Sequence, residues 1–295
     1  MLKTANPHPS PLTPHLSPIW LGAKSKFGLA LPDASPTPSQ MYAPRGVYFD
    51  DDVLIVADTG NHRIMIWHGV PQEDGVAADV VLGQPDFYSE GPNAGGRGAE
   101  NGVHLPTGVA IFEGKFFVAD AWNHRVLVWN QLPTQSNTPP DYVLGQANLR
   151  EVSKDRGGAV SALSMYWPFG IAYVAGKFYV TDTGNRRVLV WHGLPTAEQP
   201  PDLIMGQDDP TLGLENRGMG AAGNTFRWPH DVAGTADVLY IADAGNHRVL
   251  GWRGEVADRV ADLVIGQKDF VDSAEWPYGD KNASSMRFPY AISID

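Results

Sequence analysis

The chain has 295 residues, no cysteine and a formal net charge of −11 at pH 7. The lack of cysteine excludes disulfides, thiolate zinc sites and thiol catalysis, and the acidic balance argues against binding to nucleic acid or to anionic membrane surfaces. The sequence has neither an apolar run long enough to span a membrane nor a secretory signal at its N-terminus. We therefore expect a soluble, cytoplasmic protein.

The first elements in chain order are a proline-rich segment and a set of short apolar runs. Residues 1–18 predict a flexible segment, and residues 19–22, Ile-Trp-Leu-Gly, are a weak copy of a strand-and-glycine motif that returns further on. Four runs rich in Val, Ile, Tyr and Trp follow, at 47–49, 53–57, 63–67 and 80–82. Short runs between Asp, Asn and Gly are typical of antiparallel strands, and their nearly continuous apolar character indicates burial on both faces.

This group of four runs is repeated. The turn between its second and third runs reads Asp-Thr-Gly-Asn-His-Arg at 58–63, Asp-Ala-Trp-Asn-His-Arg at 120–125, Asp-Thr-Gly-Asn-Arg-Arg at 182–187 and Asp-Ala-Gly-Asn-His-Arg at 243–248, a period of 61 or 62 residues. Leu-Gly-Gln-type motifs and a proline keep the same period; they begin at Leu82, Leu144, Met205 and Ile265, and at Pro44, Pro106, Pro168, Pro229 and Pro289. A four-stranded sheet repeated at a fixed period predicts an all-β fold, a β-propeller, with blades at about 44–84, 106–146, 168–207 and 229–267.

The turn motif resembles the NHL repeat, which is named for its Asn-His-Leu signature, although this chain has Asn-His-Arg or Asn-Arg-Arg. The resemblance covers residues 19–295 and implies one propeller domain, with six blades in the complete ring. Residues 19–22 match the outermost strand of a further blade, and residues 290–294 match an innermost strand. Because the two middle strands of that blade are missing, we expect a C-terminally truncated ring of five or six blades.

The turn residues have the character of a scaffold. In the second copy Asp120 ends one strand, Arg125 begins the next, and Asn123 can adopt the left-handed conformation of the turn. A role filled four times by the same residue types favours structure over catalysis. The set comprises Asp58, Asn61, Arg63, Asp120, Asn123, Arg125, Asp182, Asn185, Arg187, Asp243, Asn246 and Arg248.

Long loops join each blade to the next and provide the best indication of function. They cover about twenty residues each, at 84–103, 146–165, 207–226 and 267–286, and in a propeller they lie on the same face as the repeated turn. Loops of this length are often functional. The alternative is that they only seal the junctions between blades.

Residues that differ between the copies are the better candidates for a site, because the fold already explains the identical ones. The residue after each proline is expected near the central axis, and the large apolar residue before it is assigned to blade packing. Trp122 takes the place of the turn glycine of the other copies, which predicts an indole that projects from the loop-bearing face. The predicted ligand-binding residues are Arg45, His104, Trp122, Tyr166, Arg227 and His230.

These observations predict a binding scaffold for a protein, a peptide or a small polar ligand on the long-loop face. The alternative is a hydrolase or lyase at the axial mouth, possibly with a metal, in which His230 and Asp231 could form an acid–base pair. The peptidyl-hydroxyglycine amidating lyase, which this chain resembles in fold, holds zinc with histidines from several blades, one of them in a Pro-His pair like Pro229-His230. The other four matching positions are not histidine; they are Arg45, Thr107, Phe169 and Tyr290.

We therefore predict no metal site and no cofactor, since a catalytic zinc normally needs three protein ligands. RNA binding would need a basic face, for which Arg97, Arg156 and Arg217 in the long loops are the available residues. The net charge of the chain argues against it.

Overall fold

Four four-stranded antiparallel sheets form the computed structural model, which describes residues 19, 21–22, 35–275 and 283–294. The strands follow one another in sequence order within each sheet. The first sheet contains β1 (Gly46–Phe49), β2 (Val53–Asp58), β3 (Arg63–His68) and β4 (Val80–Leu82). The second contains β5 (Val109–Phe112), β6 (Lys115–Asp120), β7 (Arg125–Trp129) and β8 (Tyr142–Leu144).

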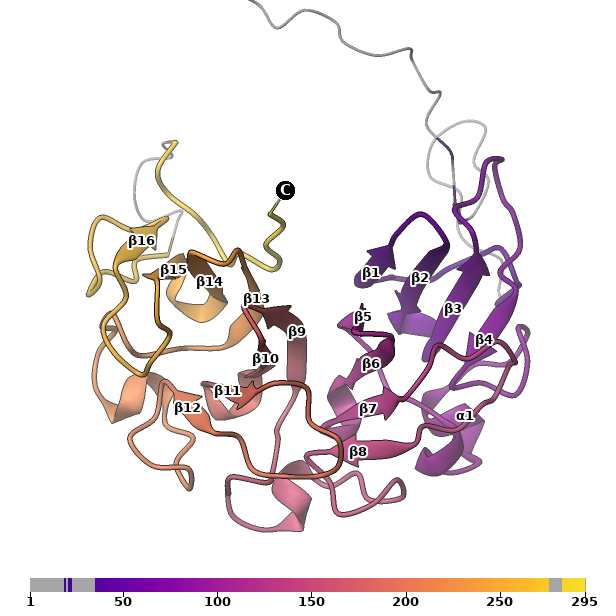
Figure 1. The fold of residues 1–295 in the computed structure, drawn as a ribbon, viewed down its shortest axis with the longest axis horizontal. Helices are drawn as coiled ribbons and strands as arrows, with labels where there is room; N and C mark the ends of the chain where they lie inside the picture. The colour runs from indigo at the N-terminus through magenta and orange to yellow at the C-terminus, as the bar shows by residue number, and fades with distance from the viewer. Residues whose placement is uncertain (1–18, 20, 23–34, 276–282, 295) are drawn as a thin grey trace, which may run out of the picture.

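The other two sheets repeat this order. The third contains β9 (Pro168–Val174), β10 (Lys177–Asp182), β11 (Arg187–His192) and β12 (Leu203–Met205). The fourth contains β13 (Pro229–Gly234), β14 (Val238–Asp243), β15 (Arg248–Arg253) and β16 (Leu263–Ile265). Figure 1 shows the four sheets around a common centre, with β1, β5, β9 and β13 innermost and an opening between the first and fourth sheets. The fold is therefore a β-propeller with four complete blades, as the sequence predicted.

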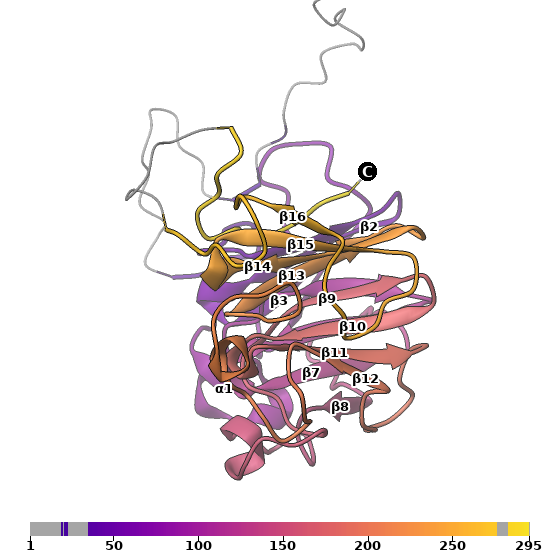
Figure 2. The ribbon, with the colours of Figure 1, turned by 90° about the vertical axis from the view of Figure 1, so that its left-hand side faces the viewer.

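Short helical turns join the strands. The repeated Asp-to-Arg turn contains a single 3-10 turn in each blade: η1 (Thr59–Asn61), η3 (Ala121–Asn123), η5 (Thr183–Asn185) and η7 (Ala244–Asn246). The long loops contain α1 (Pro92–Gly96), η2 (Ala99–Asn101), η4 (Lys154–Gly157) and η6 (Glu215–Gly218). α1 is a left-handed turn, because Asn93, Ala94 and Gly95 have φ of 53°, 56° and 67°. The turns drawn as coils gather on one side of the disc (Figure 2), which we call the loop face.

The core lies between neighbouring sheets, because the central strands bury the side chains of both faces. In β2 every residue is buried. Ile55 and Ile64 of the first sheet pack with Phe116 and Leu127 of the second, and Phe117 packs across the next junction against the third sheet. The continuous apolar runs in the sequence reflect this packing.

The innermost strands of the third and fourth sheets begin at a proline and contain an irregularity in register. Pro229 pairs with Asp243 and Asp231 pairs with Ala242, so His230 is the extra residue of a β-bulge. A bulge re-aims the side chain that it carries. The imidazole of His230, on the innermost strand of its sheet, lies among the rings of Phe169, Phe288 and Tyr290.

The terminal segments do not form strands in the described part of the chain. At 290–294 the chain is held by a side chain instead of a ladder, since the Ile292 amide donates to Asp231 Oδ2 at 2.8 Å. A strand needs a neighbouring strand to satisfy its backbone groups, and none of the described strands pairs with residues 290–294. Residues 1–18, and Trp20 within 19–22, lie outside the described residues. No helix in the described ranges is long and apolar enough to cross a membrane.

Candidate functional site

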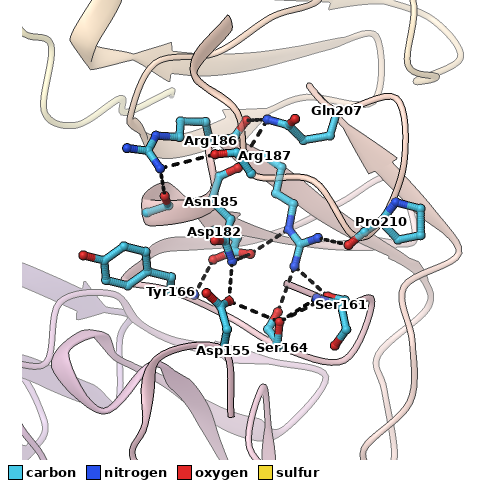
Figure 3. A network of polar contacts seen from close by, with 12 residues as sticks. Asp155, Ser161, Ser164, Tyr166, Asp182, Asn185, Arg186, Arg187, Gln207 and Pro210 are labelled. Atoms are coloured by element: carbon cyan, nitrogen blue, oxygen red, sulfur yellow. Dashed lines mark hydrogen bonds and ion pairs between the residues drawn. The ribbon is translucent and has the colours of Figure 1, made fainter. Parts of the chain in front are cut away.

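Each repeated turn is organised around a buried Asp–Arg ion pair, shown for the third blade in Figure 3. Asp182 Oδ2 accepts hydrogen bonds from Arg187 Nε at 2.7 Å and from Asn185 Nδ2 at 2.9 Å, and its Oδ1 accepts one from the Tyr166 amide at 2.7 Å. The side chains of Asp182 and Arg187 are fully buried. The carboxylate thus holds the turn and the segment before β9 together.

The same arginine fixes the long loops on both sides of its blade. Arg187 Nη2 donates to the carbonyl oxygens of Ser161 and Ser164, both at 2.9 Å, and Nη1 donates to that of Pro210 at 2.7 Å (Figure 3). The turn arginines of the other blades make equivalent bonds to loop carbonyls; these are Arg63, Arg125 and Arg248. The first part of each loop and the last part of the preceding one are therefore clamped to the sheet.

The glutamine of the Leu-Gly-Gln motif has a structural role that the sequence analysis did not assign. Gln207 Nε2 donates to the carbonyl oxygens of Asn185, Arg186 and Leu214 at 3.3, 3.1 and 2.8 Å. The same three bonds recur in the other copies, from Gln84, Gln146 and Gln267. Its recurrence at a fixed period was the signal that could have revealed this role.

The turn histidines connect neighbouring blades. Nδ1 of His62 accepts a hydrogen bond from the Leu105 amide at 3.1 Å, and His124 and His247 accept equivalent bonds from Trp167 and Phe288. An accepting Nδ1 must be unprotonated. Burial lowers the pKa of His62 to about 4, which keeps the ring neutral at pH 7. The third blade has arginine at this position, and Arg186 donates instead to the carbonyl oxygens of Gly184 in its own turn and Gly213 in the long loop.

The large residues before the prolines were assigned to blade packing from the sequence. In the structure they are half-buried and not fully enclosed between blades. Leu105, Trp167, Trp228 and Phe288 are half-buried, and they have φ of 48°, 53°, 57° and 49°. Positive φ is uncommon for bulky residues, and such strained positions cluster at functional sites. The ring of Trp167 lies 5.0 Å from that of Trp122 and 4.5 Å from that of Tyr166.

These rings are part of a continuous strip that we call the aromatic band: His104, Trp122, Tyr166 and Trp167. The Trp122 ring lies 6.5 Å from His104, and all four side chains are half-buried. Lys154 Nζ stands 4.4 Å from the centre of the Tyr166 ring. The backbone position of Trp122 adjoins His104, because its amide donates to the His104 carbonyl at 3.1 Å. The band thus combines aromatic surface with a cation.

A second group of side chains lies nearer the centre, and we call it the axial cluster: Arg45, Phe169, His230, Phe288 and Tyr290. The His230 ring lies 4.4 Å from Tyr290, 4.6 Å from Phe169 and 5.3 Å from Phe288. Arg45 Nη1 donates to the Tyr290 hydroxyl at 3.2 Å. Trp122 joins the two groups, with its ring 6.4 Å from that of Phe169.

His230 and Asp231 do not form the acid–base pair considered from the sequence. The Asp231 carboxylate accepts hydrogen bonds from the amides of Ile292 and Val232, and burial raises its pKa to about 6. Burial and the nearby charge of Arg45 lower the pKa of His230 to about 4. Among the described residues, none forms a hydrogen bond with Nδ1 of His230.

The six predicted ligand-binding residues are distributed over these two groups and their margin. His104, Trp122 and Tyr166 belong to the aromatic band, and Arg45 and His230 to the axial cluster. Arg227 stands at the margin, with its guanidinium 5.2 Å from the Trp228 ring centre and its Nε 3.2 Å from Glu215.

The arginines that could have formed a basic RNA-binding surface are partly neutralised. Arg156 forms an ion pair with Glu198, and Arg217 pairs with Asp208 and Asp258 at 2.5 Å each. Within the described ranges, no group of three or more His, Asp or Glu side chains is placed to hold a metal ion.

Comparison with known proteins agrees with the repeated turn. The family model of the NHL repeat matches residues 41–67 and 104–129, which include the turns of the first and second blades. This chain contains NHL repeats. The third and fourth blades have the same buried Asp–Arg network as the two that match.

Its similarity to curated proteins is restricted to a part of the chain. NHL repeat-containing protein 2 of Homo sapiens is 34% identical over 108 residues, which cover 35% of this chain and 13% of that protein, and the Gallus gallus protein is 33% identical over 107 residues with the same coverage. The match thus spans about an eighth of the relatives' length.

Solved structures resemble it at low sequence identity. Virginiamycin B lyase from Staphylococcus aureus has a TM-score of 0.41 and 12% identity, with 77% of this chain and 59% of the lyase covered. U3-55K has a TM-score of 0.42 and 15% identity, with 81% and 56% covered.

Proposed function

We propose that this NHL-repeat protein is a binding scaffold, and that its loop face holds a protein or peptide segment. The observation that carries the proposal is the aromatic band, which stays half-exposed beside a turn network that is fully buried. Tryptophan, tyrosine and arginine side chains dominate the binding energy of protein interfaces. The band and the axial cluster supply these residue types on one face.

The backbone supports this assignment. Leu105, Trp167, Trp228 and Phe288, which precede prolines, all have left-handed backbone, and three of them are aromatic. At the same time the clamped loops make the surface rigid, which lowers the entropy cost of binding. NHL-repeat propellers are in general interaction scaffolds, and this fold-level analogy points in the same direction.

Substitution of Trp122 by glycine tests the proposal. Gly60, Gly184 and Gly245 occupy the equivalent turn position in the other blades, so Trp122→Gly should fold while it removes the indole from the band. Peptides are first selected on the unmodified protein from a random phage-displayed library. We expect the selected peptides to bind Trp122→Gly at least about tenfold more weakly, the loss of a typical interface anchor, as measured by fluorescence anisotropy.

A second variant gives the control. Phe49 is 70% exposed at the end of β1, outside the aromatic band, and Phe49→Ser removes a comparable apolar side chain. Binding that is lost in Phe49→Ser and retained in Trp122→Gly would assign the binding surface to the ring opening and contradict the proposal. No observation of comparable weight favours the alternative hydrolase or lyase, since the His230–Asp231 pair is not formed.

A further inference from the structure

The axial cluster contains an arginine without a carboxylate partner among the described residues. Arg45 is exposed, and its only side-chain hydrogen bond there is to the Tyr290 hydroxyl. Arginines further out on the loop face are paired: Arg227 with Glu215 at 3.2 Å and Arg287 with Glu275 at 3.0 Å. The Arg45 guanidinium is therefore available for an anion.

A buried polar atom without a hydrogen-bond partner among the described residues, Nδ1 of His230, also belongs to the axial cluster. His230 is only 7% exposed, and no described residue bonds its Nδ1. Buried polar atoms are nearly always paired in folded proteins, and leaving one unpaired is costly. Both side chains contact Tyr290: Arg45 Nη1 lies 3.2 Å from its hydroxyl, and the His230 ring lies 4.4 Å from its ring. The three side chains therefore border one site.

We infer that Arg45, His230 and the Tyr290 hydroxyl form a subsite for a carboxylate group. A guanidinium binds a carboxylate through parallel hydrogen bonds, and the hydroxyl and the imidazole can each donate one more. This inference deepens the proposed function and rests on it, because the carboxylate would be that of a small organic acid or of an acidic side chain in a bound peptide.

The charge and the walls of the subsite favour a carboxylate over a phosphate. Arg45 supplies one positive charge, and His230 is neutral at pH 7, so the doubly charged form of a phosphate would be only half compensated. The rings of Phe169 and Phe288 lie within 5.3 Å of the His230 ring. They would pack against an apolar stem next to the carboxylate.

Titration with butyrate tests the inference. The ring signals of His230 in the 15N-labelled protein are assigned with His230→Asn and followed by NMR during addition of butyrate, butyramide or inorganic phosphate at constant ionic strength. We expect saturable shifts with butyrate, and at least about tenfold weaker effects with butyramide, since a tenfold change corresponds to about 1.4 kcal/mol, the typical size of a charged hydrogen bond. Equal shifts with butyrate and butyramide would overturn the inference, and so would tighter binding of phosphate.

Matched variants locate the site. Arg45→Met and Arg97→Met remove the same charge from two exposed arginines, and thermal melting verifies that both proteins are folded. We expect Arg45→Met to weaken butyrate binding at least about tenfold and Arg97→Met to change it less than about twofold. Tyr290→Phe keeps the ring and should weaken binding by a few fold. Equal effects of the two arginine variants would contradict the assigned site.

A capped tripeptide, acetyl-Gly-Glu-Gly-amide, distinguishes the two sources of the carboxylate. Tighter binding of this peptide than of butyrate identifies an acidic peptide, and the reverse order identifies a small organic acid; both depend on Arg45 if the inference is right. If butyrate fails while library peptides still require Trp122, only the carboxylate subsite is wrong. If both tests fail, the binding face itself is wrong.

Discussion

At the scale of single residues, the repeated motif is explained by burial. The Asp120 side chain is fully buried, and it accepts hydrogen bonds from Arg125 Nε, Asn123 Nδ2 and the His104 amide at 2.8, 2.8 and 2.7 Å. Each partner compensates part of the cost of removing the carboxylate from water. Because the same geometry recurs in all four blades, the motif connects the turn, the long loops and the sheet of each blade through buried hydrogen bonds.

Removal of one such carboxylate should be strongly destabilising. Asp120→Ala leaves the Arg125 guanidinium buried without its counter-charge, and we expect a loss of about 3–5 kcal/mol in the free energy of unfolding. Urea denaturation measures this loss, with Asp51→Ala in an exposed turn as the control that should change stability by less than about 0.5 kcal/mol. Similar losses in the two variants would show that the network is not what stabilises the turn.

Histidine protonation should affect the junction of the first two blades. The folded state lowers the pKa of His62 to about 4 from an ordinary value of 6.5, so the stability that depends on the neutral ring is complete above pH 6.5 and is lost as the pH falls towards 4. The His104 and Asp120 charges also act on this ring, the first lowering and the second raising its pKa. Asp231, with its raised pKa, gives the opposite dependence over part of this range.

A variant separates the contribution of His62 from these others. Asparagine tolerates left-handed backbone and can accept a hydrogen bond without titrating, so His62→Asn should lose less stability than the unmodified protein between pH 7 and pH 4.5. We expect a difference of about 1 kcal/mol, allowing for the partial solvent exposure of the ring. Parallel stability curves from urea denaturation at the two pH values would exclude this role of His62.

At the scale of elements, the sequence predicted the four sheets because repeated turns and apolar runs depend on local patterns. It did not predict the left-handed backbone of Trp167 and Trp228. The Trp167 amide is held by His124 of the preceding blade, a contact between residues 43 positions apart. The arrangement of Arg45, His230 and Tyr290 depends on segments up to 245 residues apart. Such a cluster can be recognised as a set of variable positions in a repeat, but its hydrogen bonds cannot be derived from the sequence.

The glycine after the fourth strand of the third sheet, Gly206, has no room for a side chain because the ring of Phe226 lies against it. Gly206 has φ of 90°, and a Cβ added there would collide with the buried ring of Phe226. Gly114 also has positive φ, 78°, but open space surrounds its Cβ position. We expect Gly114→Ala to cost about 1 kcal/mol for the backbone alone, and Gly206→Ala to cost about 1–3 kcal/mol more. Thermal unfolding that gives equal losses would rule out the steric contribution.

At the scale of the whole molecule, the sheets differ in how much of their surface is covered. The second and third sheets each pack between two neighbours, whereas the first and fourth border the opening of the ring (Figure 1). On β1 the side chains of Val47 and Phe49 are 63% and 70% exposed. Repeat architectures gain stability from the interfaces between neighbouring units, so the two inner sheets should be the most stable part of the protein.

Hydrogen exchange followed by mass spectrometry can test this difference. We expect the amides of β6, β7, β10 and β11 to exchange at least about tenfold more slowly than those of β2, β3, β14 and β15, because exchange from a terminal sheet requires the loss of one interface and exchange from an inner sheet requires the loss of two. Phe49→Ser, on the exposed side of the first sheet, should leave the order unchanged. Equal protection in all four sheets would mean that the open ring unfolds as one cooperative unit and that the interfaces do not differ in this way.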